Sequence, residues 1–316
     1  MWYGTRGRGR LPPQASGGLT IDQDWIARST AAGVTRAVRF DSTTDINTWY
    51  TASSSDGYNG AHLDTTTTVS PNGCARFDIP VGRSDATMWG NLGGANFLNH
   101  SFGNNSDIYL QFRYRITPSM ISNLNTWSSN WKIYNFYQGT VPCQAMEITG
   151  VHPIYNQTTY TNCGDSLATL TTSADATSAA SPPYLSQQDW ALPSGTTHEA
   201  HGVISQYPNV NWDLPTNSWM TFYVHIHIAT LGGSGNGSTV EVWVQTYGTN
   251  YWYKITSWRG NLQYTNSSSD VYDALMFTNY MTANTGGAVQ ATSTWTTEVI
   301  VSTQPIAMPQ TFPATP

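Results

Sequence analysis

Apolar and polar residues alternate with a period of two in three long segments of the chain, residues 107–116, 219–229 and 239–245. Successive side chains of a β-strand point to opposite faces, so this period indicates strands with one buried face. Helical periodicity is weak and confined to a short run at residues 23–32. Further strand-like runs lie at residues 34–40, 74–79, 131–137, 145–148, 201–206, 251–257, 274–281 and 294–302.

About a dozen strands, each with one apolar face and joined by turn-rich loops, predict two packed antiparallel sheets. We therefore expect an all-β fold, one large β-sandwich of the jelly-roll type, over residues 34–306. Residues 167–197 are rich in Ser, Thr, Ala and Pro and are expected to form a loop insertion. Residues 1–33 are expected to be an extended basic N-terminal arm, and residues 307–316 an extended C-terminal tail.

Charged residues make up only 10% of the chain, whereas aromatic residues make up 13%. Soluble domains usually carry about 25% charged residues, and disordered chains have few aromatic ones. The composition therefore excludes disorder over most of the length and favours broad sheets with hydroxyl and amide groups on their polar faces. No stretch of 18 apolar residues occurs, so a membrane span is not expected.

The basic residues are concentrated near the N-terminus. The first 40 residues hold six arginines against two aspartates, whereas the rest of the chain is acidic. A basic arm on an acidic body can contact nucleic acid or an acidic protein partner. Because the composition does not suit a nucleic-acid binder, we predict an assembly contact through Arg6, Arg8 and Arg10. No apolar segment follows these arginines, so they do not form a secretion signal.

The polar rows of the three alternating segments provide the candidate site. If these strands share a sheet, their side chains form one concave face of arginine, histidine, amide and aromatic groups. Aromatic rings stack on sugars and arginine forks bind carboxylates, so the face predicts carbohydrate binding. The alternative is that the row is only the solvated or interface face of a sheet. The predicted binding residues are Gln111, Arg113, Arg115, His225, His227, Glu241 and Trp243.

Other chemistries find less support in the sequence. His225 and His227 have the spacing of metal ligands on a strand, but no third ligand is identifiable, so neither a metal nor a cofactor is predicted. Among the three cysteines, Cys143 and Cys163 are the favoured pair, with Cys74 left over, and whether they are bonded stays open. Only four glutamates are present and no strand carries the carboxylate pattern of sandwich-fold glucanases.

Several segments together resemble a known group of proteins. They are residues 109–115, 131–132, 143–147, 160–164, 219–225, 240–244 and 299–306. The set is similar to an uncharacterised family of concanavalin A-like jelly-roll proteins encoded by tailed bacteriophages and environmental bacteria. The resemblance covers about residues 107–306 and implies a fold similar to that of lectins, glucanases and alginate-lyase type polysaccharide lyases.

The similarity to lyases implies candidate catalytic residues. Enzymes of the alginate-lyase type carry a strand arginine, a Gln-x-His strand and a Tyr/Lys strand near the C-terminus. Arg113 or Arg115 matches the first, His225 supplies the histidine of the second, and Tyr280 is nearest to the third. The glutamine before His225 and the C-terminal lysine pattern are missing, so the sequence favours a protein without catalytic activity.

The functional expectation is a structural virion protein of a tailed bacteriophage, with carbohydrate binding on its concave sheet. Its expected partners are other virion subunits, contacted through the N-terminal arm in a homo-oligomer, and a polysaccharide of the host surface. The first alternative is a polysaccharide lyase that acts by β-elimination on uronic-acid polymers. The second alternative is a secreted, extracellular lectin-like module.

Overall fold

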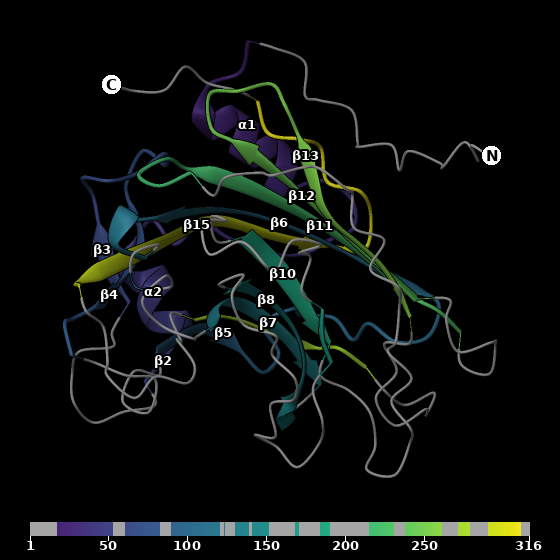
Figure 1. The fold of residues 1–316 in the computed structure, drawn as a ribbon. Coiled ribbons are helices and arrows are strands. Elements are labelled where there is room, and N and C mark those ends of the chain that lie inside the picture. The colour runs from purple at the N-terminus through teal and green to yellow at the C-terminus, as the bar shows by residue number, and fades with distance from the viewer. Residues whose placement is uncertain are drawn as a thin grey trace, which may run out of the picture.

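The computed structural model describes residues 18–52, 61–82, 90–120, 123, 130–138, 141–151, 168–170, 184–189, 215–230, 238–260, 271–278 and 290–310. Within these residues the strands form two antiparallel sheets, which lie one above the other in Figure 1. The predicted all-β jelly-roll sandwich is thus confirmed. No helix in the described part of the chain is long and apolar enough to cross a membrane.

Sheet I is the eight-stranded upper layer in Figure 1. Seven of its strands follow the order β13-β12-β11-β6-β15-β4-β3, and β1 pairs with the C-terminal half of β15. Its strands are β1 (Val34–Val38), β3 (His62–Asp64), β4 (Cys74–Ile79), β6 (Ser106–Ile116), β11 (Met220–Ile228), β12 (Ser238–Thr246), β13 (Tyr253–Gly260) and β15 (Thr292–Ser302).

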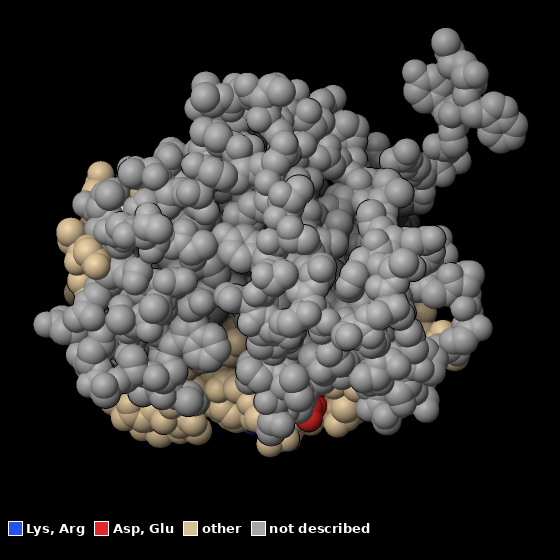
Figure 2. All heavy atoms as spheres, turned by 60° about the horizontal axis from the view of Figure 1, so that its bottom comes forward, with Lys and Arg blue, Asp and Glu red and all other residues tan. Residues whose placement is uncertain are grey.

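Sheet II is the seven-stranded lower layer, in the order β2-β5-β14-β7-β8-β10-β9. Its strands are β2 (Tyr50–Ala52), β5 (Gly90–Gly94), β7 (Asn130–Gln138), β8 (Val141–Val151), β9 (Ala168–Leu170), β10 (Tyr184–Asp189) and β14 (Ala274–Thr278). Figure 2 shows one face of the molecule, on which the described atoms are almost all tan. The small share of charged residues is visible there as a nearly uncharged described surface.

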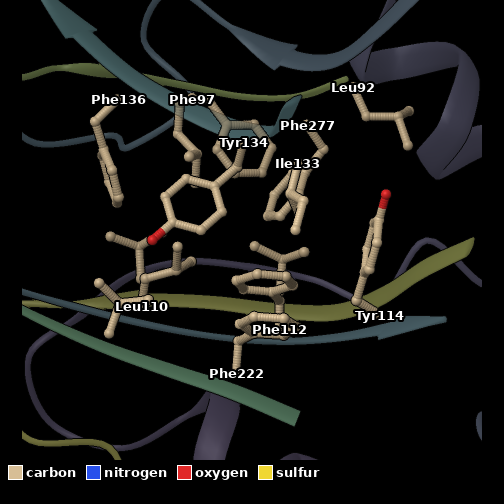
Figure 3. Close-up of a cluster of buried hydrophobic side chains, with 14 of the residues drawn as sticks. Leu92, Phe97, Leu110, Phe112, Tyr114, Ile133, Tyr134, Phe136, Phe222 and Phe277 are labelled. Carbon is tan, nitrogen blue, oxygen red and sulfur yellow. The ribbon is translucent and has the colours of Figure 1, made fainter. Parts of the chain in front are cut away.

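The core lies between the two sheets and is built by the predicted apolar rows (Figure 3). Phe112 of β6 stacks on Phe222 of β11, with ring centroids 4.8 Å apart. The same ring meets Tyr134 and Phe277 of sheet II edge-on, at 5.4 and 5.0 Å. Aromatic pairs in these orientations add to the free energy gained from burial. The alternation in β6 and β11 therefore fixes which face of sheet I turns outward.

Two short helices lie outside the sheets. Helix α1 (Ile21–Ser29) begins with a capping box, because Thr20 Oγ1 accepts from the Gln23 amide and Gln23 Oε1 accepts from the Thr20 amide. Helix α2 (Thr43–Trp49) begins at Ser42, whose hydroxyl accepts from the Asp45 amide. In Figure 1, α1 lies over the outer face of sheet I near β12 and β13.

The chain ends differ from the expectation of extended segments. Residues 18–33 carry α1, which packs its Trp25 against a buried cluster that includes Ile306 and Met308. Residues 306–310 are therefore held against the same face rather than extending as a free tail. The physical reason is that Trp25 and Met308 cover apolar rings of sheet I, which would otherwise face water. The predicted contact residues Arg6, Arg8 and Arg10 lie outside the described residues.

The predicted loop insertion at residues 167–197 also differs from the structure in part. It contains β9 and β10, and β10 pairs along its whole length with β8. The sequence of β10 lacks a regular apolar row, so alternation does not predict this strand, whereas its backbone pairing with β8 defines it. The run expected at residues 201–206 lies outside the described residues.

Candidate functional site

The three strands that carry the predicted polar row are neighbours in sheet I. In the backbone register His225 of β11 lies between Tyr109 of β6 and Glu241 of β12. Tyr223 lies in the same way between Gln111 and Trp243. These side chains alternate with the core rows, so they belong to the outer face of the sheet. The structure thus brings the predicted residues onto one face, which it divides into three parts.

The middle part of the row is covered by α1 and residues 306–310. Gln111, Arg113 and Trp243 are exposed by only 0, 2 and 6%. Gln111 accepts from Arg28 Nη1 of α1 at 2.6 Å and donates to the carbonyl of Ala307 at 3.1 Å. A ligand from solution cannot reach these polar groups, because α1 and residues 306–310 cover them.

Glu298 explains why arginines are tolerated beneath the helix. Its Oε2 accepts from Arg28 Nη2 and from Arg113 Nε, both at 2.8 Å. Burial raises the pKa of Glu298, but the charges of Arg113 and Arg28 outweigh this and lower it below the ordinary value. Asp24 completes the network through a 2.9 Å hydrogen bond from Arg28 Nε. Arg113 therefore has a structural partner on β15 and is not available to a substrate.

Glu298 had no signal in the alternation pattern. Its φ is +52°, and the register of β15 against β6 shifts between Thr297 and Ile300. Such a β-bulge re-aims a side chain that simple alternation would place elsewhere. The carboxylate that neutralises the middle of the row could not be located from the sequence for this reason.

The open part of the row lies at the start of β6 and the end of β11. It holds five polar or aromatic side chains, none of them fully buried. We call this set the histidine cluster. Its members are Asp107, Tyr109, His225, His227 and Glu241. Asp107 and Tyr109 were not among the predicted site residues, although both have the same parity in β6 as Gln111.

Both ring nitrogens of His225 face carboxylates, and an aromatic ring stacks on its plane. Its Nε2 lies 2.8 Å from Asp107 Oδ1, and its Nδ1 lies 3.7 Å from Glu241 Oε2. The ring of Tyr109 stacks on it in parallel, with centroids 4.4 Å apart. Burial lowers the pKa of His225, but the carboxylates of Glu241 and Asp107 outweigh this and raise it. His225 thus lies between two carboxylates that favour its protonated form, and neither of its ring nitrogens is left free for a ligand.

His227 is engaged on one nitrogen only. Its Nδ1 lies 3.2 Å from Asp107 Oδ1, the atom that also meets His225. Among the described side chains its Nε2 has no partner, and the side chain is 33% exposed. An aspartate bonded to Nδ1 fixes the tautomer in which Nε2 carries the lone pair. The Asp107–His227 pair is therefore arranged as a general base that opens to solvent.

The third part of the row is Arg115, at the other end of β6. It lies beside Trp295 of β15, with its guanidinium 5.5 Å from the ring centroid. Tyr280 and Cys163 lie outside the described residues, and the side chain of Cys143 does too, so the structure does not address the predicted pair. Cys74 is a buried free thiol. No group of three His, Cys, Asp or Glu in the described ranges is arranged to hold a metal ion.

No protein-family model matches the sequence, and no curated protein does so either. Among solved structures, the PL-14 alginate lyase from Aplysia kurodai is similar with a TM-score of 0.53 at 10% identity, covering 86% of this chain and 100% of that one. An alginate lyase from Chlorella virus has a TM-score of 0.45 at 8% identity, covering 86 and 100%. The catalytic domain of a glycoside hydrolase family 131 protein from Coprinopsis cinerea has a TM-score of 0.41 at 13% identity, covering 90% of this chain and 100% of that one.

The first of these likenesses is one of fold, and the two weaker ones carry no argument. It nevertheless corrects one expectation. The sequence favoured a protein without catalytic activity, because the lyase motifs are incomplete. The solved protein whose fold this chain shares at a TM-score of 0.53 is an enzyme. The expectation of a non-enzymatic protein is therefore overturned.

Proposed function

We propose that the protein is a polysaccharide lyase, which cleaves a uronic-acid polymer by β-elimination. The observation that carries the proposal is the Asp107–His227 pair on the outer face of sheet I. His227 Nδ1 lies 3.2 Å from Asp107 Oδ1, and the histidine faces solvent as a base. The fold likeness to an alginate lyase supports the same class of reaction. The proposal differs from the sequence expectation in its base, which is His227 rather than His225.

β-Elimination on a uronate moves one proton to the enzyme and one to the leaving sugar. The base removes the proton on the carbon beside the carboxylate, and that electron pair forms the new carbon–carbon double bond. The neighbouring carbon–oxygen bond breaks, and its oxygen takes a proton from an acid. His227 Nε2 is the base in this scheme, since Asp107 holds its other nitrogen.

Tyr109 is our candidate for the acid. Burial raises the pKa of its phenol, and the charges of Asp107 and Glu241 raise it further. A phenol with a raised pKa keeps its proton at neutral pH and can donate it to a leaving oxygen. The ring is stacked on His225, two residues from His227 on the same strand face.

His225 is proposed as a positioning residue. Asp107 and Glu241 would repel an anionic polymer if their charges were not balanced. The ring of His225 lies between them, and its protonated form offsets part of this charge.

The test is an elimination assay on the full chain. Uronic-acid polymers and a neutral polysaccharide are incubated with the protein, and the ultraviolet absorbance of new unsaturated ends is followed. The proposal predicts absorbance that rises with time on at least one uronic-acid polymer and not on the neutral one. No rise on a panel of uronic-acid polymers would reject it.

The role in a bacteriophage particle gains no support from the fold or from the comparisons. The predicted virion partners, the virion location and the contact through Arg6, Arg8 and Arg10 stay predictions. Carbohydrate binding on the outer face of sheet I is kept here as part of the lyase proposal, with His227 and Glu241 at its centre.

A further inference from the structure

A cluster of arginines and tryptophans lies on the outer face of sheet I, away from the histidine cluster. Arg115 pairs in register with Trp295 of β15, and Trp295 pairs with Arg76 of β4. On the other side, Trp219 precedes Met220, which pairs with Tyr114, so Trp219 is next to Arg115. Arginine and tryptophan therefore alternate across four adjacent strands at this end of the face.

Trp295 is a fixed support for both arginines. Its ring lies between the guanidinium groups of Arg76 and Arg115, at 5.3 and 5.5 Å from the ring centroid. Its Nε1 donates to Asp64 Oδ2 at 2.8 Å, and the side chain is buried. A guanidinium stacked on a fixed ring loses little further freedom when it binds a ligand.

The two arginines differ in what neutralises them. Arg76 Nε donates to Asp78 at 2.8 Å, its Nη2 donates to Ser293 at 3.2 Å, and its Nη1 lies 3.7 Å from Asp64. Arg115 makes no ion pair or hydrogen bond with any described residue, and its Nε is buried without an acceptor. Burial lowers the pKa of Arg115, and the charge of Asp64, which lies beyond ion-pair distance, does not outweigh this.

Arg36 shows how the chain treats an arginine that serves only the fold. It also stacks on a tryptophan, with its guanidinium 4.5 Å from the Trp49 ring centroid. Its Nε donates to the Phe97 carbonyl at 2.7 Å, and its Nη2 donates to the Asn96 carbonyl at 3.4 Å. Arg115 has the stacked geometry without the acceptors, so its donors are left for a group from outside the chain.

We propose that Arg115, supported on Trp295, is a second binding site that takes the carboxylate of an acidic sugar. The ligand class rests on the proposed lyase function. A planar guanidinium can hold a carboxylate by two parallel hydrogen bonds, which matches the unit that repeats along a uronic-acid polymer. The site is separate from the base, since Trp219 and His227 lie eight residues apart along the same extended segment, roughly 26 Å.

The experiment measures binding apart from cleavage. A uronic-acid oligosaccharide and a neutral oligosaccharide of the same length are titrated into the full chain by calorimetry. All proteins carry His227→Ala, so that the ligand stays intact. Arg115→Gln is compared with the unchanged arginine, and Arg36→Gln is the matched control of a stacked arginine with backbone acceptors.

The site predicts that Arg115→Gln weakens uronate binding by about 10-fold or more, the loss of one charge-assisted contact. It predicts no change for Arg36→Gln and weak binding of the neutral sugar in all variants. Equal uronate affinity with and without Arg115, equal affinity for the neutral sugar, or no binding to any variant would each overturn it. Binding that depends on Arg115, together with no cleavage by the unchanged chain in the elimination assay, would reject the lyase function but support this binding site.

Discussion

Arg28 of α1 donates to Glu298 of β15 at 2.8 Å, across 270 residues of sequence. Both side chains are buried, and Arg113 shares the same carboxylate oxygen. The N-terminal helix is therefore fastened to the sheet by charges that have no contact with water. The contact also decides which part of the polar row stays open to a ligand.

Removing the carboxylate of Glu298 should destabilise the whole domain. Glu298→Gln leaves the buried Arg113 without a counter-charge and leaves Arg28 with Asp24 alone. Removing one partner of a buried ion pair typically costs about 3–5 kcal/mol. Urea unfolding measures this loss of the free energy of unfolding. Asp22→Asn is the control, because Asp22 is a largely exposed partner of Arg39 and its loss should cost less than about 1 kcal/mol. Equal effects of the two changes would contradict the account of the buried network.

The same network predicts sensitivity to acid. The pKa of Glu298 is raised by burial but lowered, on balance, by Arg113 and Arg28. A lowered folded-state pKa gives stability that is present above the unfolded value, about 4.5, and is lost as pH falls through the folded value. Unfolding midpoints in urea should therefore drop steeply below pH 4.5. In Glu298→Gln this part of the acid dependence should be missing.

His225 predicts a dependence of the opposite sign. Burial lowers its pKa, but Glu241 and Asp107 raise it overall, so its ion pairs stabilise the fold fully below the unfolded value near 6.5. That stability is lost as pH rises through the raised folded value. A proton titration of His225 by NMR should show its midpoint above 6.5, and Asp107→Asn should move the midpoint down. An unshifted midpoint in the unchanged chain would refute the placement of His225 between the carboxylates of Asp107 and Glu241.

Gly93 of β5 tests the packing of sheet II. Its φ is +105°, and a Cβ there would overlap the carbonyl oxygen of Leu275 on β14. Gly82 also has a positive φ, +76°, but a Cβ there meets nothing within 4 Å. Gly82→Ala should cost about 1–2 kcal/mol from backbone strain alone, and Gly93→Ala clearly more. Thermal unfolding of both variants gives the difference, and equal costs would refute the close approach of the two strands.

The sequence predicted the fold better than the site. Alternation in residues 107–116 and 219–229 placed Phe112 and Phe222 in the core and the polar row outside, because burial of one face enforces a period of two. It could not show that α1 covers Gln111 and Arg113, since that contact depends on Glu298 at a bulge. Nor could it tell His225 from His227, which share a parity and differ only in their carboxylate contacts.

The short strands were missed for a related reason. β2, β5 and β9 contain three to five residues, and β5 is rich in glycine, so no alternation can be read in them. Pairing with a longer neighbour forms such strands, as β10 does for β9. Residues 23–32 carry only a weak helical pattern, and the contact of α1 with the sheet lies in tertiary structure that a local pattern does not contain.

In the proposed reaction His227, not His225, removes the proton of the substrate. The measurement is the initial rate of formation of unsaturated ends on the preferred uronic-acid polymer, for the unchanged chain, His227→Ala and His62→Ala. His62 is a half-exposed histidine of β3 and serves as the control. We expect His227→Ala to lower the rate by about 10²–10⁴-fold, the range of general-base catalysis. We expect His62→Ala to leave the rate unchanged. A His227→Ala protein that is folded and as fast as the unchanged chain would contradict it.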